Sequence, residues 1–285
     1  MIKPSELPLA ADGSLYHIHL TPDTLADKVL LVGDPDRVDM FKTIFDTVEH
    51  ESHNRELHAL TGRYHGSRLT ALSTGMGCDN IDIVMTELDV AADGRRLQLV
   101  RIGTSGSLQE EIDCGSHVAS AYAIGLDGLM NYYKEWGESK SGRVEETKME
   151  EAFISHLSPF TSHLSPFARP YCVAGSSLLL DKIAPDMHHG ITATAPGFYG
   201  PQGRTVRLHP AIDNLNEKLA SFSYGGLTVT NLEMETSAIY GFSHLLGHEA
   251  LTVCLIIANR PKGTFLSDYH APMRHLVGTV VERLT

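Results

Sequence analysis

Short apolar runs alternate with helix-like segments along most of the chain, and this alternation restricts the possible folds more than any other feature. We expect strands at 28–33, 68–74, 97–103, 116–125, 171–175, 190–195, 226–232 and 251–258. We expect helices at 35–45, 79–92, 176–188, 210–221, 235–247 and 268–284. Strands that alternate with helices predict a mainly parallel sheet covered on both faces. The expected fold is therefore α/β, a three-layer α/β/α sandwich with a mixed, mainly parallel central sheet.

The stretch 131–170 breaks this alternation. It begins with a highly charged run and continues with two copies of the sequence SHLSPF. A segment this polar and repetitive is not typical of a core. No linker rich in Pro, Gly and Ser divides the chain elsewhere, so we expect one domain over residues 1–285, with 131–170 as a surface excursion or lid.

The net charge restricts the partners that the chain can bind. Its 285 residues carry a formal net charge of −12, with 42% hydrophobic residues. An acidic surface repels nucleic acid and anionic membranes, so a small anion would need a local cluster of arginines. The four cysteines form no CxxC pair, which indicates reduced thiols and no zinc site. No apolar run approaches the roughly 20 residues of a membrane span, and the N-terminus has no signal-peptide core, so we expect a cytoplasmic protein.

The sequence VGDPDR places unusual residues where a strand ends and a helix begins. Gly33 lets backbone N–H groups approach a ligand, and Asp34 can cap a helix that Pro35 opens. The N-terminus of that helix attracts anions, and Arg37 adds a full charge one turn later. The junction can bind phosphate, although a solvated arginine beside an ordinary turn would look the same.

The sequence RIGTSGS carries the same kind of chemistry. Arg101 follows an apolar strand, and a charge at that point needs a partner. Gly103 and Gly106 flank Thr104 and Ser105, which we expect to offer two hydroxyls and a run of free amides. A guanidinium, hydroxyls and N–H groups together suit phosphate. The alternative is an arginine paired with a structural carboxylate.

Two further segments carry candidate site residues. In NLEMET, strand alternation would send Glu233 and Glu235 to one side and Met234 to the other, and a carboxylate there can accept two sugar hydroxyls. The alternative is a pair of acids that interact with a helix dipole. In FYGPQGR, Phe198 can stack on a planar base and Gln202 offers a donor and an acceptor.

Taken in order, several motifs resemble the uridine phosphorylase branch of the nucleoside phosphorylase-I family. They are YHIHLT, VGDPDR, SHNRE, STGMG, RIGTSGS, FYGPQGR, NLEMET and IIANR. The resemblance covers most of the chain and is poor at 126–172. The chain departs from the usual family pattern in FYGPQG and in GTSG, but the F-xxx-Q-x-R spacing is kept.

The resemblance implies roles for particular residues. The phosphate-binding positions it implies are Gly33, Arg37, Arg101, Thr104 and, lent by the neighbouring subunit, Arg55. The ribose-binding positions it implies are Thr104, Glu233, Met234, Glu235 and, lent across the same interface, His17. The base-binding positions it implies are Ser105, Gly106, Phe198, Gln202, Arg204, Ile257 and Ala258. Among these, Arg101, Gln202, Arg204 and Glu235 are the implied catalytic residues.

The implied activity is a pentosyltransferase reaction, the reversible phosphorolysis of uridine to uracil and ribose 1-phosphate. No organic cofactor or catalytic metal is implied, and the assembly is a homo-oligomer built from dimers with shared sites, in many members a hexamer. The family also uses a monovalent cation near the position of Glu56, with a hydroxyl where this chain has Asn80.

Three other functions stay open at this stage. A purine nucleoside phosphorylase of the same fold is the nearest, but its hexameric form uses an aspartate near the position of Asn259, and asparagine cannot act as that acid. A nucleosidase would use water and would not need several arginines around an anion. A non-catalytic nucleoside-binding protein is the third.

Overall fold

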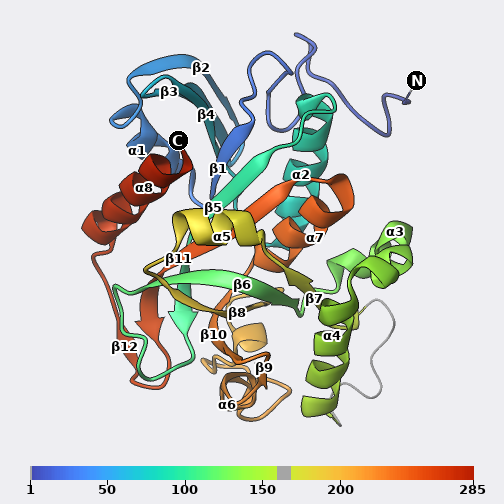
Figure 1. Cartoon of the computed structure of the whole chain (residues 1–285), viewed down its shortest axis with the longest axis vertical. Helices are drawn as coiled ribbons and strands as arrows, with labels where there is room; N and C mark the ends of the chain where they lie inside the picture. Colours follow the sequence, from blue (N-terminus) through green and yellow to red (C-terminus); the bar gives the residue numbers. More distant parts are fainter. Residues whose placement is uncertain (1, 159–167) are drawn as a thin grey trace.

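The computed structural model describes residues 2–158 and 168–285, which form one sheet flanked by helices (Figure 1). The strands are β1 (Lys28–Val32), β2 (Thr47–Asn54), β3 (Leu57–Tyr64), β4 (Ser67–Ser73), β5 (Gln98–Ser107), β6 (His117–Gly125), β7 (Tyr171–Ala174), β8 (His188–Thr194), β9 (Ser223–Tyr224), β10 (Leu227–Glu233), β11 (Glu249–Asn259) and β12 (Thr264–Phe265). The α-helices are α1 (Val38–Lys42), α2 (Cys78–Ala92), α3 (Lys134–Glu138), α4 (Val144–His156), α5 (Ser177–Ile183), α6 (Leu215–Ala220), α7 (Thr236–Leu246) and α8 (His270–Leu284). Each predicted strand and helix is present, with shifted bounds.

The strands form a twelve-stranded mixed sheet. Its order is β12–β11–β6–β8–β10–β5–β1–β4–β3–β2, with β7 beside β6 and β9 beside β10. Strand β5 also pairs with β11, so that β5, β11, β6, β8 and β10 close into a ring. The prediction of a mixed sheet is confirmed, but among the described residues antiparallel pairings are at least as common as parallel ones. The closed ring was not predicted.

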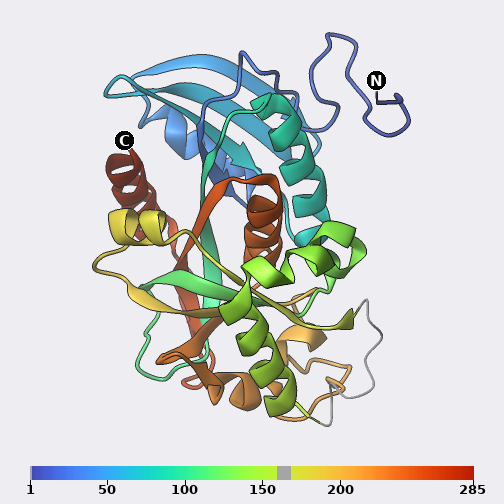
Figure 2. The same ribbon diagram turned by 45° about the vertical axis from the view of Figure 1, so that its right-hand side comes forward.

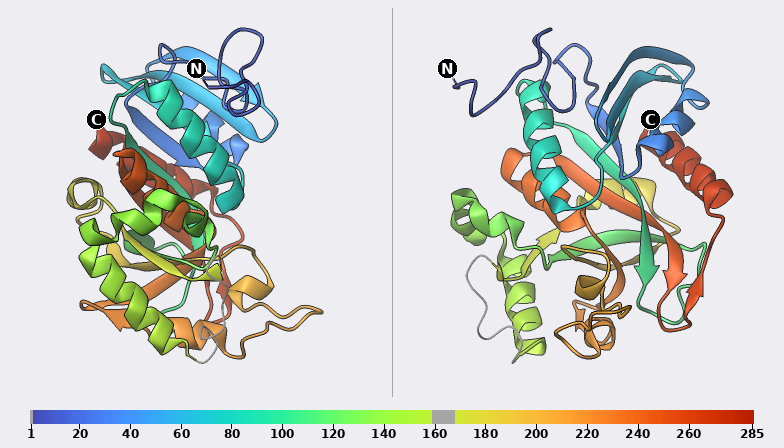
Figure 3. Two further views of the ribbon diagram at one scale, coloured as in Figure 1. Left: turned by 90° about the vertical axis from the view of Figure 1, so that its right-hand side faces the viewer. Right: turned by 180° about the vertical axis from the view of Figure 1, so that it is seen from behind.

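Helices cover both faces of the sheet, as predicted. Val29 and Leu31 of β1 point toward α2 and α7, whereas Leu30 and Val32 point toward α1, α5 and α8. Because both faces of β1 are buried, its sequence is a continuous apolar run. Figure 2 and Figure 3 show these two helical layers on either side of the strands. No helix in the described part of the chain is long and apolar enough to cross a membrane.

The hairpin β2–β3 was not predicted, because β2 reads as a polar segment. Its sequence TVEHESHN lies at the edge of the sheet and its residues alternate between exposed and partly exposed positions over much of its length. Edge strands commonly carry such charged and polar side chains. The first predicted helix is also shorter than expected, since Pro35–Arg37 form a separate 3₁₀ turn before α1.

The stretch 131–170 is less peripheral than predicted. It contains α3 and α4, and Trp136, Met149 and Phe153 from these helices are buried in the core. Arg143 is also buried, with its guanidinium carbon 3.5 Å from the centre of the Trp136 ring. The charged residues between them had hidden this core-facing pattern. Residues 159–167, which include most of the SHLSPF repeat, lie outside the described residues, and the role of the segment as a lid stays a prediction.

Candidate active site

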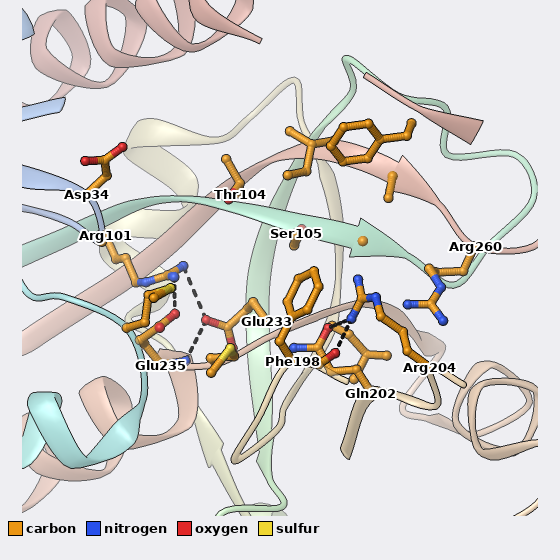
Figure 4. Close-up of a pocket in the computed structure, with 18 of the residues that line it drawn as sticks. Asp34, Arg101, Thr104, Ser105, Phe198, Gln202, Arg204, Glu233, Glu235 and Arg260 are labelled. Atoms are coloured by element: carbon orange, nitrogen blue, oxygen red, sulfur yellow. Dashed lines mark hydrogen bonds and ion pairs between the residues drawn. The ribbon is translucent and has the colours of Figure 1, made fainter. Parts of the chain in front are cut away.

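The ends of several strands meet at one cavity of about 920 Å³ (Figure 4). Apart from His17 and Arg55, all of the predicted site residues line it. They are Gly33, Arg37, Arg101, Thr104, Ser105, Gly106, Phe198, Gln202, Arg204, Glu233, Met234, Glu235, Ile257 and Ala258. A cavity of this size can hold a small organic molecule together with a small anion.

Arg101 is the most buried of the arginines that line this cavity. Its guanidinium forms an ion pair with Glu235, and its Nη1 atom lies 3.3 Å from Glu233 Oε2. Burial disfavours the charged guanidinium, but the carboxylates of Glu235 and Glu233 outweigh burial and raise the pKa of Arg101. Its Nε atom is buried and has no hydrogen-bond partner in the structure. Arg101 is therefore a fixed cation with one donor left over.

Position 103 requires a glycine because the side chain of Arg101 folds back over it. A Cβ atom at Gly103 would lie 2.0 Å from Arg101 Nη1, which is far inside van der Waals contact. The two residues are two apart on β5, so their side chains share one face of the strand. The glycine therefore makes room for the guanidinium rather than for a ligand.

The expectation of free amides at 104–107 was wrong. Strand β5 runs on to Ser107, and residues from Thr104 onward pair with β11. The glycines that suggested a loop are accommodated in the strand. Thr104 and Ser105 nevertheless line the cavity, and the Ser105 hydroxyl accepts a hydrogen bond from Asn231 Nδ2 at 3.0 Å. The hydroxyls, not the backbone amides, are thus the groups this segment can offer.

Glu233 and Glu235 both contact Arg101, although β10 ends at Glu233. Glu233 Oε2 accepts hydrogen bonds from the backbone N–H groups of Glu235 and Thr236 at 2.9 and 3.0 Å, at the start of α7. Glu235 Oε1 accepts one from the N–H of Gly77 at 2.7 Å. Burial raises the pKa of Glu235, and the Arg101 guanidinium opposes that rise. The two glutamates thus balance the charge of Arg101, and Glu233 also accepts hydrogen bonds at the N-terminus of α7.

Arg37 is buried close to Arg101 but has no acidic partner among the described residues. Its Nη1 atom donates to the carbonyl of Ile102 at 3.2 Å, and its buried Nε has no partner. Burial and the neighbouring charge of Arg101 both lower its pKa. Two buried guanidinium groups with unused donors form a strong binding site for an anion.

The turn that carries Arg37 is built as predicted. The Asp34 side chain accepts a hydrogen bond from the Asp36 N–H at 3.0 Å, and Pro35 opens the turn. A Cβ at Gly33 would lie 3.4 Å from Arg37 Nη2, so this glycine keeps the floor of the cavity open beside the guanidinium. Because α1 has only five residues, its dipole is weak, and Arg37 itself supplies most of the positive charge.

The opposite end of the cavity is formed by Phe198, Gln202, Arg204 and Arg260 (Figure 4). Arg204 Nη1 donates to Gln202 Oε1 at 2.7 Å, and its guanidinium carbon lies 3.7 Å from the centre of the Phe198 ring. Burial lowers the pKa of Arg204 to about 10, with a further contribution from Arg260. Neither arginine has a carboxylate partner within the described residues. This end can therefore accept oxygen atoms that carry partial or full negative charge.

Asn259 is held by the protein itself. Its Nδ2 atom donates to the carbonyls of Gln109, Glu110 and Ile112 at 2.9 to 3.2 Å. Its Oδ1 accepts from the N–H of Lys262 at 2.9 Å. Although Asn259 lines the cavity, its amide is fully used in fixing the loop after β5 and the turn after β11.

His17 and Arg55 lie outside the cavity. His17 Nδ1 is 2.6 Å from Glu87 Oε1, and this buried carboxylate also accepts from the backbone N–H of Ile18 at 2.9 Å. Arg55 is exposed in the two-residue turn between β2 and β3, where its φ of 56° is unusual for a residue other than glycine. Within a single chain, these two predicted residues do not join the others.

The structure adds Arg260, a residue to which the sequence gave no role. Arg260 directly follows the apolar strand β11 and lines the cavity. The argument used for Arg101, that a charge next to an apolar strand needs a partner, would also have identified Arg260. Glu56 and Asn80 line the cavity on either side of Gly75, since a Cβ on this glycine would touch both side chains. Asn80 Nδ2 donates to the Met76 carbonyl at 3.3 Å.

The fold and the cavity define an α/β/α protein with two buried arginines, Arg37 and Arg101, next to a glutamate pair. The family model of the phosphorylase superfamily matches residues 27–275, and the chain belongs to that family.

The similar proteins include both a uridine phosphorylase and a purine nucleoside phosphorylase. A uridine phosphorylase from Thermococcus kodakarensis is 28% identical over 265 residues, which are 92% of this chain and 83% of that protein. A DeoD-type purine nucleoside phosphorylase from Oceanobacillus iheyensis is 34% identical over 241 residues, which are 84% of this chain and 85% of that protein. Among solved structures, a Trypanosoma brucei nucleoside phosphorylase described as showing uridine phosphorylase activity has a TM-score of 0.80 and 28% identity, covering 97% of this chain and 99% of that one.

Proposed function

We propose that the protein is a uridine phosphorylase, which converts uridine and phosphate reversibly into uracil and ribose 1-phosphate in pyrimidine salvage. The observation that carries the proposal is the division of one cavity into three parts. Arg101 lies at one end, Glu233 and Glu235 lie next to it, and Gln202 and Arg204 lie at the other end (Figure 4). Arg37 also lines the cavity, close to Arg101. This order matches the order of phosphate, ribose and base in the reacting complex.

In this proposal phosphate binds between Arg37, Arg101 and Thr104. The two buried Nε–H groups that lack partners would each gain an acceptor. A hydrogen bond to a charged group contributes on the order of 1.5–3 kcal/mol, which offsets the repulsion of an anion by an acidic protein. The bound phosphate attacks C1′ and also stabilises the positive charge that develops on the ribose ring.

The ribose lies over Glu235 and Met234 in this proposal. Each carboxylate oxygen of Glu235 accepts one hydrogen bond inside the protein, from Gly77 or from Arg101. A carboxylate oxygen has two lone pairs, so both oxygens can accept another bond from the 2′- and 3′-hydroxyls. The sugar would then be held with C1′ facing phosphate, which lowers the entropic cost of the attack.

The base leaves as an anion stabilised by Gln202 and Arg204. Bond cleavage moves negative charge onto the two uracil oxygens, and the uncompensated charges of Arg204 and Arg260 lie at that end of the cavity. Donors that meet charge only as it develops accelerate the reaction itself. No step in this mechanism requires a metal or an organic cofactor.

The proposal includes a homo-oligomer in the cytoplasm, with dimers that share active sites and a hexamer as the complete assembly. His17 and Arg55 would complete the neighbouring subunit's site. Arg55 is exposed and held in an unfavourable backbone conformation, which is typical of residues kept for function. A monovalent cation would bind near Glu56 at the same interface.

A purine nucleoside phosphorylase is the second candidate. The purine enzyme from Oceanobacillus iheyensis is 34% identical to this chain, whereas the uridine phosphorylase from Thermococcus kodakarensis is 28% identical. Asn259 argues against it. Its amide is used in four hydrogen bonds within the protein, so it neither carries an acidic proton nor faces a base.

One assay separates the candidates. The purified protein is incubated with uridine, thymidine, inosine or adenosine, with and without phosphate, and the products are separated by chromatography. We expect phosphate-dependent release of uracil. Release of hypoxanthine or adenine alone would favour the purine enzyme, release without phosphate would favour a nucleosidase, and no release would favour a binding protein.

A further inference from the structure

A glutamate and two histidines lie together on the β2–β3 hairpin, outside the cavity. Glu51 and His53 are two apart on β2 and so share one face, and His58 on β3 is directly opposite His53. One possible ligand atom from each of the three side chains lies within 4.8 Å of the other two. These three side chains, which we call the hairpin cluster, offer the ligand types that transition metals prefer.

The spacing in the hairpin cluster fits a tetrahedral metal ion. Glu51 Oε1 lies 3.1 Å from His53 Nε2 and 3.0 Å from His58 Nε2. Zinc binds imidazole and carboxylate at about 2.0–2.2 Å, which in a tetrahedron sets the ligand atoms about 3.3 Å apart. Small adjustments of two exposed side chains, Glu51 and His53, would therefore complete the geometry.

His58 is oriented as a metal ligand would be, because its other ring nitrogen, Nδ1, contacts a backbone carbonyl. Its side chain is 2% exposed, and its Nδ1 lies 3.3 Å from the Pro35 carbonyl, which can only accept a hydrogen bond. The proton of a neutral ring therefore lies on Nδ1, and the lone pair of Nε2 faces the Glu51 carboxylate. Two such groups repel each other unless a cation or a second proton lies between them. A carbonyl that orients the far nitrogen is the usual support of a metal-binding histidine.

Lys42 supplies the positive charge in the absence of a metal. Its Nζ lies 2.6 Å from Glu51 Oε1 and 2.9 Å from Asp39 Oδ1. The hydrogen bond from Lys42 is the largest reason that the pKa of Glu51 falls to about 2. The lysine can stay with Asp39 if Glu51 turns toward another cation. The rings of His53 and His58 stack with centroids 3.6 Å apart, and the Nε2 atom of each faces Glu51 Oε1.

We propose that the hairpin cluster binds a divalent transition-metal cation of the zinc type through Glu51, His53 and His58. Water completes the coordination, and the Lys42 ammonium moves onto Asp39. The bound ion would join β2 to β3 close to the turn that carries Arg55. This site is separate from the proposed nucleoside site and does not depend on it.

The experiment is calorimetric titration of the chelator-treated full-length protein with Zn²⁺ alone, repeated with Co²⁺ to follow its visible absorption. We expect one tight Zn²⁺ per chain and intense bands typical of tetrahedral Co²⁺. His53→Ala and Glu51→Gln should each weaken Zn²⁺ binding at least about tenfold. Lys42→Met should strengthen it, because a competing cation is removed. The control is His188→Ala, which removes an exposed histidine on β8 and should leave binding unchanged.

Zn²⁺ binding by His53→Ala with the affinity of the unsubstituted protein would overturn the proposal, as would the absence of tight binding. Equal affinity in Lys42→Met and the unsubstituted protein would overturn the displacement of the lysine. These variants change exposed or partly exposed side chains and leave the buried His58 in place, so we expect them to fold. Scanning calorimetry of each variant checks its folding separately from metal binding.

Discussion

Arginines occupy both ends of the cavity, but their charges are balanced in different ways. At one end Arg101 is buried against Glu233 and Glu235. At the other end Arg204 and Arg260 have no carboxylate partner in the described residues, and burial, together with the charge of Arg260, lowers the pKa of Arg204. The charge of Arg101 is balanced by carboxylates before any ligand binds, whereas the charges of Arg204 and Arg260 are balanced only when negative charge arrives.

This difference teaches how an acidic protein can use arginine for two purposes. An ion-paired cluster in the core fixes a guanidinium and two carboxylates in one geometry, since removing the arginine would leave two buried carboxylates without a counter-charge. Arg204 rests on the Phe198 ring and is held by neutral partners, the Gln202 amide oxygen and the Phe198 carbonyl. Arg37 combines both properties, because it is buried yet forms no ion pair with any of the described residues.

The largest expected effect is that of Arg101→Met. It would leave Glu233 and Glu235 buried side by side without a counter-charge, so we expect a loss of about 3–5 kcal/mol in the free energy of unfolding, together with loss of phosphorolysis. Denaturant unfolding measures the first and product chromatography the second. A loss below about 1 kcal/mol would show that the ion pair does not fix this end of the cavity.

Arg204→Ala comes next and probes the opposite end. Removing a donor to a charge that develops in the transition state should lower kcat about 100-fold or more, because such donors contribute about 2.7–4 kcal/mol. Phosphate affinity and stability should change little. Arg207→Ala, an exposed arginine of the same loop that does not line the cavity, is the control. Parallel losses in kcat and in phosphate affinity would remove the distinction between the two ends.

Arg37→Met tests the buried arginine that lacks an acid. We expect phosphate binding to weaken about tenfold to 100-fold, as 1.5–3 kcal/mol of charge-assisted hydrogen bonding is lost. The free energy of unfolding should not fall, because the substitution removes a buried charge that no carboxylate balances. Calorimetric titration with phosphate gives the affinity, and Arg274→Met on the surface of α8 controls for net charge.

Gly103→Ala gives the smallest expected effect and sharpens the account of Arg101. The new methyl group would displace the guanidinium, so we expect a loss of about 1–3 kcal/mol in unfolding free energy and a fall in kcat. Gly278→Ala in α8 is the matched control, since no atom lies within 4 Å of a Cβ there, and helix propensity predicts a small gain. If both variants have equal stability, Arg101 is free to move.

Much of this cavity could be predicted because its residues follow apolar strands. Gly33, Arg37, Arg101, Glu235 and their neighbours in sequence occur within or just after strands that reach one cavity. The pairing of Arg101 with both glutamates could not be assigned from local spacing, since it joins β5 to β10. Spacing alone therefore left open whether Arg101 serves a ligand, a structural ion pair or both.

Other features escaped prediction for physical reasons. The polar edge strand β2 has no apolar periodicity, because one of its sides has no neighbour in the sheet. The glycines of β5 suggested a loop in the sequence, but they lie within the strand. Gly103 is required there because the side chain of Arg101 folds back over it. The charged surfaces of α3 and α4 concealed Trp136 and Phe153, which are buried.

The most direct measurement is a crystal structure of the protein with phosphate. We expect one anion in contact with Arg37, Arg101 and Thr104, with Glu233 and Glu235 still paired to Arg101. Phosphate bound at Arg204 and Arg260 instead, or an Arg37 side chain turned away from an empty site, would contradict the account.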